Sequence, residues 1–369
     1  DSVAQSSITT DTYVTTENMV KDRGGITAYS GELPASAGTA YKKGDTLVSN
    51  IRPYLQKIWL ADRDGACSKD VLVFRSINTD SLLPEFLHLL LWQKDFFNYD
   101  MSTFTGTGRP RGDKDELLKY SIPVPTLSEQ RALIDGFNRL TDEIDSKRQQ
   151  IAALKESVKS RFVEVFGDPV DGKKWPFVRL EDLCTKLGSG ATPRGGKTAY
   201  KAEGVPLVRS MNVHNGRFVW KDLACIDDEQ AAKLEGVTLM KGDVLLNITG
   251  ASVARSCLLP DELAGGRVNQ HVSIVRVDQK RMLPVLLNTV LISDSYQKLL
   301  LNGSRAAGAT REAITKEDLK RMTVPLPPLE LQQEFADFVA QVDKSQFALE
   351  QEVDALSAER DALLDRFLA

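Results

Sequence analysis

Two copies of one sequence pattern make up this chain, and the repeat constrains the fold more than any other feature of its 369 residues. Lys43-Gly44-Asp45 matches Lys241-Gly242-Asp243, and three further segments recur in the same order. These segments pair as 65–76 with 266–277, 83–92 with 283–292, and 113–130 with 315–332. The offset is 198 residues at the first match and 202 at the last. A period of this length predicts a duplicated folding unit.

Each copy ends in a segment with the pattern of a long helix. Thr126 is a predicted N-cap with Glu129 three residues later, and Pro123 and Pro125 hold the entering chain extended. Apolar residues then recur at alternating spacings of four and three, which is typical of a coiled coil. In the first copy they are Leu133, Phe137, Leu140, Ile144, Ile151, Leu154, Val158 and Val165. In the second copy they are Phe335, Phe338, Val342, Leu349, Val353, Leu356, Leu363 and Phe367.

Lys147 and Arg161 interrupt the first apolar series, and Ser345 and Arg360 interrupt the second. We expect two helices of about 40 residues, each about 60 Å long at 1.5 Å per residue. Pairing of the two helices along this narrow stripe is the main interpretation. Two separate surface helices, each packed on its own domain, remain the alternative.

The predicted organisation is a globular domain, a long helix, a second globular domain and a second long helix. Gly167 and Pro169 end the first helix, and a linker follows. Short β-branched runs predict strands at 45–51, 70–74, 243–248 and 271–277, and apolar runs predict helices at 83–97 and 283–301. Each globular part is therefore a mixed α/β domain. The expected boundaries are 1–125, 126–167, 168–325 and 326–369.

Charge and cysteine content narrow the functional classes. The net charge is −4, but the segment from Leu329 onward carries 3 basic and 10 acidic residues, so the remainder carries +3. A mildly basic body gives weak support for a polyanionic partner. The four cysteines and three histidines are scattered, which argues against a metal site or disulfides and favours a cytoplasmic protein. No apolar run approaches the roughly 20 residues needed to span a bilayer.

The junctions between the predicted domains and helices carry a family resemblance. Both copies pass through a Pro-x-Pro segment, IPVPTLSEQ at 122–130 and VPLPPL at 324–329, and Phe166-Gly167-Asp168-Pro169 with Trp175 follows the first helix. Over nearly the whole chain these marks resemble the specificity subunit (HsdS family) of type I restriction–modification systems. The first copy departs from the pattern, because it lacks a counterpart of residues 175–198. Either the usual N-terminal strand is absent or the chain has been shortened.

The resemblance implies a fold and a role. The two globular parts would be α+β target recognition domains, each reading one half of a split site in double-stranded DNA and separated by two long antiparallel coiled-coil helices. The helices would dock two methylation subunits (HsdM-like), and restriction/translocase subunits (HsdR-like) would join the full complex. Such a subunit takes part in phage defence and has no catalytic residue, cofactor or membrane contact of its own.

Candidate DNA contacts in the first copy lie at a strand end and in a glycine-rich loop. Arg52, Tyr54 and Lys57 follow the predicted strand at 45–51. Arginine can bridge guanine O6 and N7, and tyrosine or lysine can hold a phosphate. A surface salt bridge and a half-buried tyrosine are the alternative. Loop 103–114 adds Arg109 and Arg111, and the matching loop of the second copy adds Arg311 opposite Arg109. Contact with a partner subunit, or a plain loop, are alternatives for both loops.

The second copy offers five further candidates. They are Arg194, Lys197, Arg209, Asn212 and Ser252, all in polar stretches. Asparagine suits adenine N6 and N7, but an asparagine in a loop also serves turns, so both roles stay open for Asn212.

An enzymatic reading rests on the stretch ATPRGGKT (191–198), which fits a loose P-loop pattern. A P-loop needs a buried strand before it and a helix starting at its Lys-Thr, whereas Gly204 and Pro206 follow within eight residues. The chain also has no Asn-Pro-Pro-Tyr or Asp-Pro-Pro-Tyr motif of an adenine methyltransferase. We therefore expect a non-catalytic DNA-specificity subunit reading a bipartite, asymmetric target. A stand-alone DNA-binding protein or coiled-coil adaptor of a phage-defence system, or a nucleotide-dependent enzyme, are the alternatives.

Overall fold

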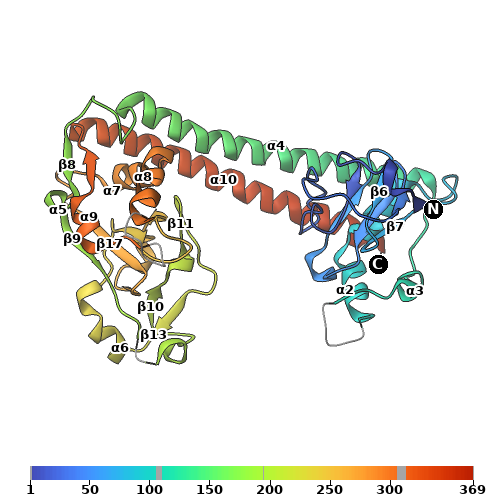
Figure 1. The fold of residues 1–369 in the computed structure, drawn as a ribbon, viewed down its shortest axis with the longest axis horizontal. Coiled ribbons are helices and arrows are strands. Elements are labelled where there is room, and N and C mark those ends of the chain that lie inside the picture. Colours follow the sequence, from blue (N-terminus) through green and yellow to red (C-terminus); the bar gives the residue numbers. More distant parts are fainter. Residues whose placement is uncertain (1, 105–109, 194, 306–312, 369) are drawn as a thin grey trace. The chain divides into compact units, whose positions relative to one another are not determined.

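The computed structural model describes residues 2–104, 110–193, 195–305 and 313–368 (Figure 1). The chain divides into two compact units. Unit 1 comprises residues 1–149 and 349–369, and unit 2 comprises residues 150–348. The helices α4 (Leu127–Phe166) and α10 (Leu329–Leu368) have 40 residues each, and each is continuous from one unit into the other. Each unit therefore contains one globular part and a portion of both long helices.

Unit 1 holds two small sheets. Its central sheet has the antiparallel order β5-β4-β7, formed by Ile58–Leu60, Thr46–Ser49 and Val71–Phe74. The other sheet has the order β1-β3-β6-β2, formed by Ser2–Val3, Gly38–Tyr41, Gly65–Cys67 and Tyr13–Val14. The helices are α1 (Pro84–Trp92), α2 (Lys94–Ser102) and α3 (Lys114–Leu117), with 3₁₀ turns at Gln5–Ser7 and Pro53–Leu55.

Unit 2 repeats the central sheet and adds strands. The central sheet has the antiparallel order β15-β14-β17-β9, formed by Ser256–Leu258, Val244–Asn247, Val272–Val277 and Cys184–Ser189. Smaller groups are β13-β10-β16 (Ala224–Ile226, Val205–Val208, Arg267–Val268), the hairpin β11-β12 (Val213–His214, Arg217–Phe218), and β18-β8 (Thr323–Pro325, Phe177–Arg179). The α-helices are α5 (Leu180–Leu183), α6 (Asp228–Lys233), α7 (Pro284–Ile292), α8 (Asp294–Arg305) and α9 (Lys316–Arg321). The 3₁₀ turns are Gly196–Ala199, Ser210–Asn212, Glu235–Val237 and Asp261–Leu263.

The prediction of two mixed α/β copies followed by long helices is confirmed. Strand β4 corresponds to β14 and β7 to β17, and both pairs run antiparallel over four residues. One difference matches the shorter start of the first copy. In unit 2, β9 pairs with the outer edge of β17, whereas in the described part of unit 1 no strand pairs with the corresponding edge of β7.

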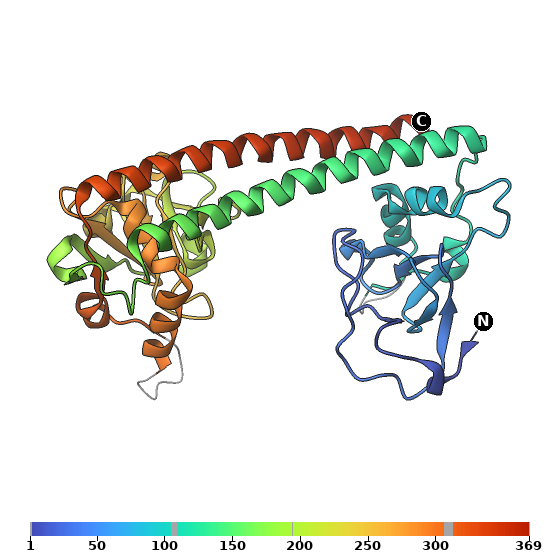
Figure 2. The ribbon, with the colours of Figure 1, turned by 90° about the horizontal axis from the view of Figure 1, so that it is seen from above.

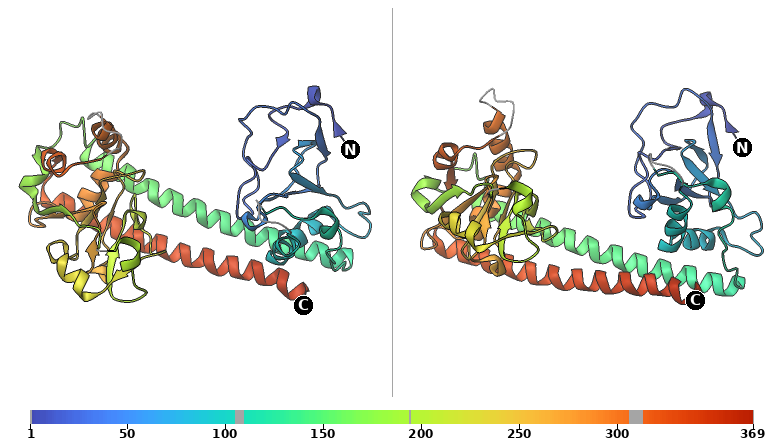
Figure 3. Two further views of the ribbon diagram at one scale, coloured as in Figure 1. Left: turned by 60° about the horizontal axis from the view of Figure 1, so that its bottom comes forward. Right: turned by 90° about the horizontal axis from the view of Figure 1, so that it is seen from below.

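The long helices run antiparallel within each unit, where they lie side by side (Figure 3). In unit 1 the Lys147 ammonium lies 2.5 Å from the Glu352 carboxylate, and Gly136 faces Leu363. In unit 2 the ring centroid of Phe335 lies 5.9 Å from that of Phe162 and 5.4 Å from that of Phe166.

Burial along the helices differs between the predicted seam residues. The buried ones are Leu133, Phe137, Leu140, Ile144, Phe335 and Val342. The half-buried ones are Ile151, Leu154, Val158, Val165, Phe338, Leu349, Val353, Leu356 and Leu363, and the side chain of Phe367 lies outside the described residues. The sequence pattern missed Phe162, Phe166 and Leu364, which are buried. A straight helix has 3.6 residues per turn, so a seven-residue apolar repeat rotates about 20° around the helix axis per heptad. The residues that face the partner helix therefore change along its length.

Apolar packing joins each globular part to the long helices. In unit 1, Phe86 and Leu90 of α1 pack with Leu133 of α4. Figure 2 shows the ribbon of unit 1 from above, with its helices beside α4. In unit 2, Phe162, Phe166 and Phe335 belong to the same core cluster as the strands β14 and β17. No helix among the described residues is long and apolar enough to cross a membrane.

Candidate nucleic-acid interface

A tight turn follows strand β4 in unit 1 and carries two of the predicted contacts of that unit, Arg52 and Tyr54. We call residues 52–56 the Arg52 turn. Arg52 (φ 53°) and Gln56 (φ 48°) both have left-handed backbones, and the Leu55 amide donates to the Arg52 carbonyl at 2.8 Å. Left-handed conformations are unfavourable for residues with a Cβ atom, so two of them in five residues need support from their surroundings.

That support comes from the segment around Asp22 and Arg23, which sequence analysis did not single out. Their amides donate to the carbonyls of Leu55 and Gln56, both at 2.9 Å, and Arg23 Nε also donates to Gln56 Oε1 at 2.9 Å. Asp22 (φ 57°) and Arg23 (φ 63°) are left-handed as well. The glycine pair after Arg23 was the available sequence signal, because such pairs mark turns.

Three of the predicted residues are exposed in or beside the Arg52 turn. Arg52 is exposed, and the Tyr54 side chain is 53% exposed. The Ile51–Arg111 bridge and the bond from the Arg52 amide to the Pro110 carbonyl, at 2.9 Å, place Arg111 beside them. Arg111 also donates to Asp70 at 2.7 Å, so its charge is partly compensated. Arg109 lies outside the described residues.

Lys57 points back toward the body of the unit. Its ammonium donates to the Thr16 carbonyl at 2.5 Å, and burial lowers the pKa of Lys57, with Arg52 acting in the same direction. In the described structure the Lys57 side chain therefore links the end of the Arg52 turn to the segment around Thr16.

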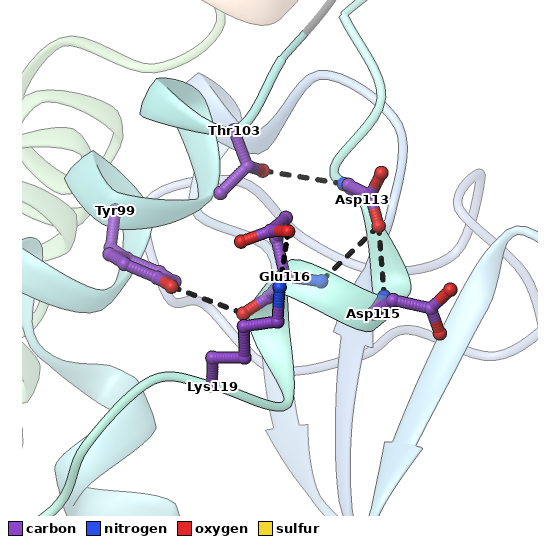
Figure 4. A network of polar contacts seen from close by, with 6 residues as sticks. All are labelled: Tyr99, Thr103, Asp113, Asp115, Glu116 and Lys119. Carbon is purple, nitrogen blue, oxygen red and sulfur yellow. Dashed lines mark hydrogen bonds and ion pairs between the residues drawn. The ribbon is translucent and has the colours of Figure 1, made fainter.

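The loop that carries Arg111 is closed at its base by a polar network (Figure 4). Asp113 caps α3, because its Oδ1 accepts the amides of Asp115 and Glu116 at 2.9 and 3.2 Å. The Asp113 amide in turn donates to Thr103 Oγ1 at 3.3 Å, and Tyr99 Oη donates to the Glu116 carbonyl at 3.1 Å. These hydrogen bonds hold Thr103 and Asp113, near the two ends of loop 103–114, next to helices α2 and α3.

A buried carboxyl group lies beneath this region. Asp100 of α2 is fully buried, and neither of its carboxylate oxygens has a hydrogen-bond partner among the described residues. Burial raises the pKa of Asp100 to about 7. A Cβ atom on Gly112 would lie 1.9 Å from Asp100 Oδ1 and 3.0 Å from Asn50 Oδ1, so only glycine fits there. The corresponding residues of unit 2, Ile248, Leu300 and Ile314, belong to its apolar core.

Unit 2 contains the counterpart of the Arg52 turn, which we call the Gly250 turn (residues 250–254). Gly250 (φ 81°) and Ala254 (φ 71°) are left-handed, and the Val253 amide donates to the Gly250 carbonyl at 3.0 Å. Ser252 is half-buried and its hydroxyl accepts from Asn247 Nδ2 at 3.1 Å. Arg311 lies outside the described residues.

Two further candidates of unit 2, Arg209 and Asn212, differ in burial: Arg209 is half-buried and Asn212 is fully buried. The Arg209 guanidinium lies 5.0 Å from the centre of the Tyr200 ring and donates to the Asp222 carbonyl. Asn212 is fully buried, accepts from the Arg209 amide at 3.1 Å, and donates to the carbonyls of Val219 and Lys221 at 2.9 and 3.3 Å. Asn212 therefore stabilises a turn, which is the second of the two roles that the sequence left open. The prediction that it contacts DNA is wrong.

The P-loop-like stretch does not have the geometry that nucleotide binding needs. Lys197 and Thr198 lie in a 3₁₀ turn, Gly196–Ala199, and the next element is strand β10. A P-loop requires an α-helix whose first turn starts at these residues. Arg194 and the side chain of Lys197 lie outside the described residues. Within the described ranges, no three His, Cys, Asp or Glu side chains are grouped to hold a metal ion.

Comparison with known proteins identifies the family. The model of the type I restriction modification DNA specificity domain (Methylase_S) matches residues 9–156 and again residues 172–356. The chain belongs to the Methylase_S family. Each match covers one copy of the internal repeat.

Several Methylase_S relatives are similar over much of the chain. The EcoKI specificity subunit of Escherichia coli K12 is 23% identical over 68% of this chain and 56% of its own length. The EcoBI specificity subunit of Escherichia coli is 24% identical over 93% of this chain and 75% of its own length. The chain thus spans little more than half of the first of these relatives.

Solved structures support the fold. A chain from a structure of the type I R-M system superposes with a TM-score of 0.58 at 24% identity, covering 99% of this chain and 93% of that one. The type I S subunit from M. genitalium gives a TM-score of 0.55 at 13% identity, covering 100% and 96%.

Proposed function

We propose that this chain is the non-catalytic specificity subunit of a type I restriction–modification complex and reads a bipartite, asymmetric site in double-stranded DNA. The observation that carries the proposal is the duplication of a DNA-specificity domain within one chain. Two similar but unequal domains suit a target with two unequal halves. Two modules on one chain also gain affinity, because the second contact becomes intramolecular.

The proposed contacts of unit 1 follow from exposure and charge, whereas the two proposed in unit 2 are half-buried. In unit 1 they are Arg52, Tyr54 and Arg111, which are exposed and lie on backbone segments that bridge at Ile51–Arg111. In unit 2 they are Arg209 and Ser252. Four further candidates stay predictions from the sequence: Arg109 in unit 1, and Arg194, Lys197 and Arg311 in unit 2. Arginine can bridge guanine O6 and N7 in the major groove, whereas tyrosine and serine hydroxyls can contact phosphates.

The proposed partners are two methylation subunits docked on the long helices, with restriction subunits in the full complex. The exposed faces of α10 carry much of its acidic excess, such as Glu334, Asp337 and Glu359. The acidic surface of α10 suits protein partners and repels DNA, so we assign DNA binding to the globular parts. The expected compartment is the cytoplasm, where such a complex meets DNA.

The test is selection from a random duplex library by the chain co-expressed with the methylation subunit of its system. We expect enrichment of two short unequal sequences at a fixed separation. Enrichment of one contiguous site would favour a stand-alone DNA-binding protein, and failure to enrich any sequence would contradict the proposal. ATP hydrolysis or DNA methylation by the purified chain alone would favour an enzyme.

A matched pair of variants links the selection to the surface of unit 1. Arg52→Ala should weaken binding by roughly ten-fold or more, because one bidentate contact contributes about 1–3 kcal/mol. Lys43→Ala removes an equally exposed positive charge away from the turn and should leave affinity nearly unchanged.

A further inference from the structure

The Arg52 turn and the Gly250 turn have left-handed residues at the same two positions. Residue by residue, the left-handed positions coincide: Arg52 with Gly250, and Gln56 with Ala254. Before each turn the chain bridges to a later loop, at Ile51–Arg111 in unit 1 and Thr249–Ala313 in unit 2.

The hydrogen bonds around the two turns coincide as well. The Ser49 amide donates to the Lys57 carbonyl at 3.0 Å, and the Asn247 amide donates to the Arg255 carbonyl at 2.8 Å. On the other side, the bond from the Asn50 amide to Asp70 matches the bond from the Ile248 amide to His271, at 2.8 and 2.9 Å. The strand ends that carry the two turns therefore share these hydrogen bonds. Inside the turns one bond differs, because the Gln56 amide donates to the Pro53 carbonyl and the Ala254 amide donates to the Asn247 carbonyl, both at 2.8 Å.

The side chains on this shared frame are very different. The Arg52 turn presents Arg52 and Tyr54, whereas the Gly250 turn presents no side chain at Gly250 and a half-buried hydroxyl at Ser252. The Arg52 turn can extend two long side chains into a groove, whereas the Gly250 turn can bring only its backbone and one short hydroxyl side chain close. Such a difference changes what is recognised without changing the fold.

Arg52 occupies a position that its own backbone disfavours. A left-handed residue is easiest for glycine, and unit 2 shows that glycine is compatible with this frame. Within the described residues the Arg52 guanidinium forms no hydrogen bond or ion pair, and the Tyr54 hydroxyl forms no hydrogen bond. Neither side chain thus makes a polar contact in the described fold that would offset the unfavourable backbone.

We propose that these two turns are equivalent DNA-reading elements, and that Arg52 and Tyr54 make the half-site read by unit 1 differ from the half-site read by unit 2. This inference rests on the proposed function. The Arg52 guanidinium contacts a base edge, Tyr54 positions the turn on the adjacent backbone, and the Gly250 turn approaches its half-site through main-chain groups.

The experiment transplants the turn within the chain–methylation subunit complex. Residues 52–56 are replaced by the sequence of residues 250–254, and the selection from random duplexes is repeated. We expect the preferred bases to change or relax in one half-site, with the other half-site and the separation unchanged. An unchanged pair of half-sites would overturn the inference.

Single substitutions separate reading from folding. Arg52→Gly should leave the unfolding midpoint unchanged or raise it, because the backbone strain is relieved, while affinity for the selected site falls about ten-fold or more. Arg52→Lys keeps the charge but not the bidentate geometry, so base preference should relax while the salt dependence of binding is retained. A lowered midpoint with intact base preference in Arg52→Gly would instead assign Arg52 a structural role.

The controls distinguish failure of the inference from failure of the proposed function. If the unmodified complex enriches no split site, the proposed function itself fails. If it enriches a split site and the transplant does not alter either half, only the assignment of the turns fails. Lys43→Ala should select the same sequences as the unmodified chain.

Discussion

Gln130 and Gln332 make the same three hydrogen bonds in the two copies of the repeat. Each side-chain carbonyl accepts the amide that starts a helix, that of Leu83 or Leu283, at 2.8 Å. Each side-chain amide donates to the carbonyl two residues before that leucine and to Pro125 or Pro327, at distances of 2.7 to 3.0 Å. Both glutamines are fully buried, so each joins a long helix to its globular part.

Gln130→Ala should lower the free energy of unfolding by about 2–4 kcal/mol, because it leaves buried polar groups without partners. Amide hydrogen exchange gives the local measurement. The Leu83 amide should exchange faster while the Leu283 amide stays protected, and Gln332→Ala should give the reverse. Gln149→Ala, at an exposed position of the same helix, should change stability by less than about 0.5 kcal/mol. Equal loss of protection at both leucines would contradict this prediction.

The buried Asp100 should make stability fall as pH rises. Its pKa is raised to about 7 in the folded chain, against about 3.9 for an unfolded aspartate. The folded state therefore holds a proton that the unfolded state releases, and the associated stability is present below about pH 4 and lost by about pH 7. The loss is at most about 4 kcal/mol, since one pKa unit is worth 1.4 kcal/mol.

Asp100→Asn should remove this dependence. Urea unfolding of both proteins at several pH values from 4.5 to 7.5 gives the test, because the difference between them cancels all other titrations. Asp95→Asn, at an exposed position of the same helix, is the control. A difference that stays constant over this range would show that Asp100 does not titrate there.

An arginine in the predicted seam should stabilise unit 1 through an aromatic contact. The Arg360 guanidinium lies 4.7 Å from the centre of the Trp92 ring and 5.4 Å from that of Phe137, and Arg23 lies 4.1 Å from the same Trp92 ring. Arg360→Ala should cost about 1–2 kcal/mol, as expected for a desolvated cation–π contact. A double-mutant cycle with Trp92→Leu should give a coupling of about 1 kcal/mol. Arg148→Ala, at an exposed position of α4, should have little effect, and a coupling near zero would exclude the aromatic contact as the cause.

Two equivalent ion pairs should differ in strength because their arginines differ in exposure. Asp45 binds Arg75 at 2.6 and 2.7 Å, and Asp243 binds Arg276 at 2.6 and 2.8 Å. The Arg75 side chain is 38% exposed and the Arg276 side chain 20% exposed. Asp243→Asn should cost about 3–5 kcal/mol, because it leaves a largely buried guanidinium unpaired.

Asp45→Asn should cost clearly less, because water can reach Arg75. Denaturant unfolding of the two variants gives the ranking, and the reverse order would contradict it. Asp261→Asn breaks the exposed pair with Lys241 and should change stability by less than about 1 kcal/mol.

Helices, strands and helix caps were predictable from the sequence where the residues within a few positions determine them. The strand predicted at 243–248 is β14 (Val244–Asn247), because short β-branched runs fit a buried sheet. The helix predicted at 83–97 is two helices, since Gln93 adopts an extended backbone between α1 and α2. The capping box at Thr126 is present, with Glu129 accepting the Thr126 amide at 2.9 Å.

The candidate contacts were predictable by residue type but not by orientation. Arg52 and Asn212 looked alike as polar residues in turns, yet Arg52 is exposed and Asn212 is fully buried. Side-chain direction depends on which carbonyls the surrounding turns leave unpaired, and those come from residues up to nine positions away in the case of Asn212. Sequence spacing does not carry that information.

The sequence by itself determined the duplication, the mixed α/β class and the two long helices, because these follow from periodicity and end signals that act over a few residues. Only the tertiary structure decided that the Arg52 and Gly250 turns share two left-handed positions, and that the helix contacts pass to Phe162 and Phe166. Left-handed backbones and helix drift depend on packing against distant segments. A turn that one copy forms with glycine and the other with arginine has no common sequence signal, because the hydrogen bonds around it impose the conformation.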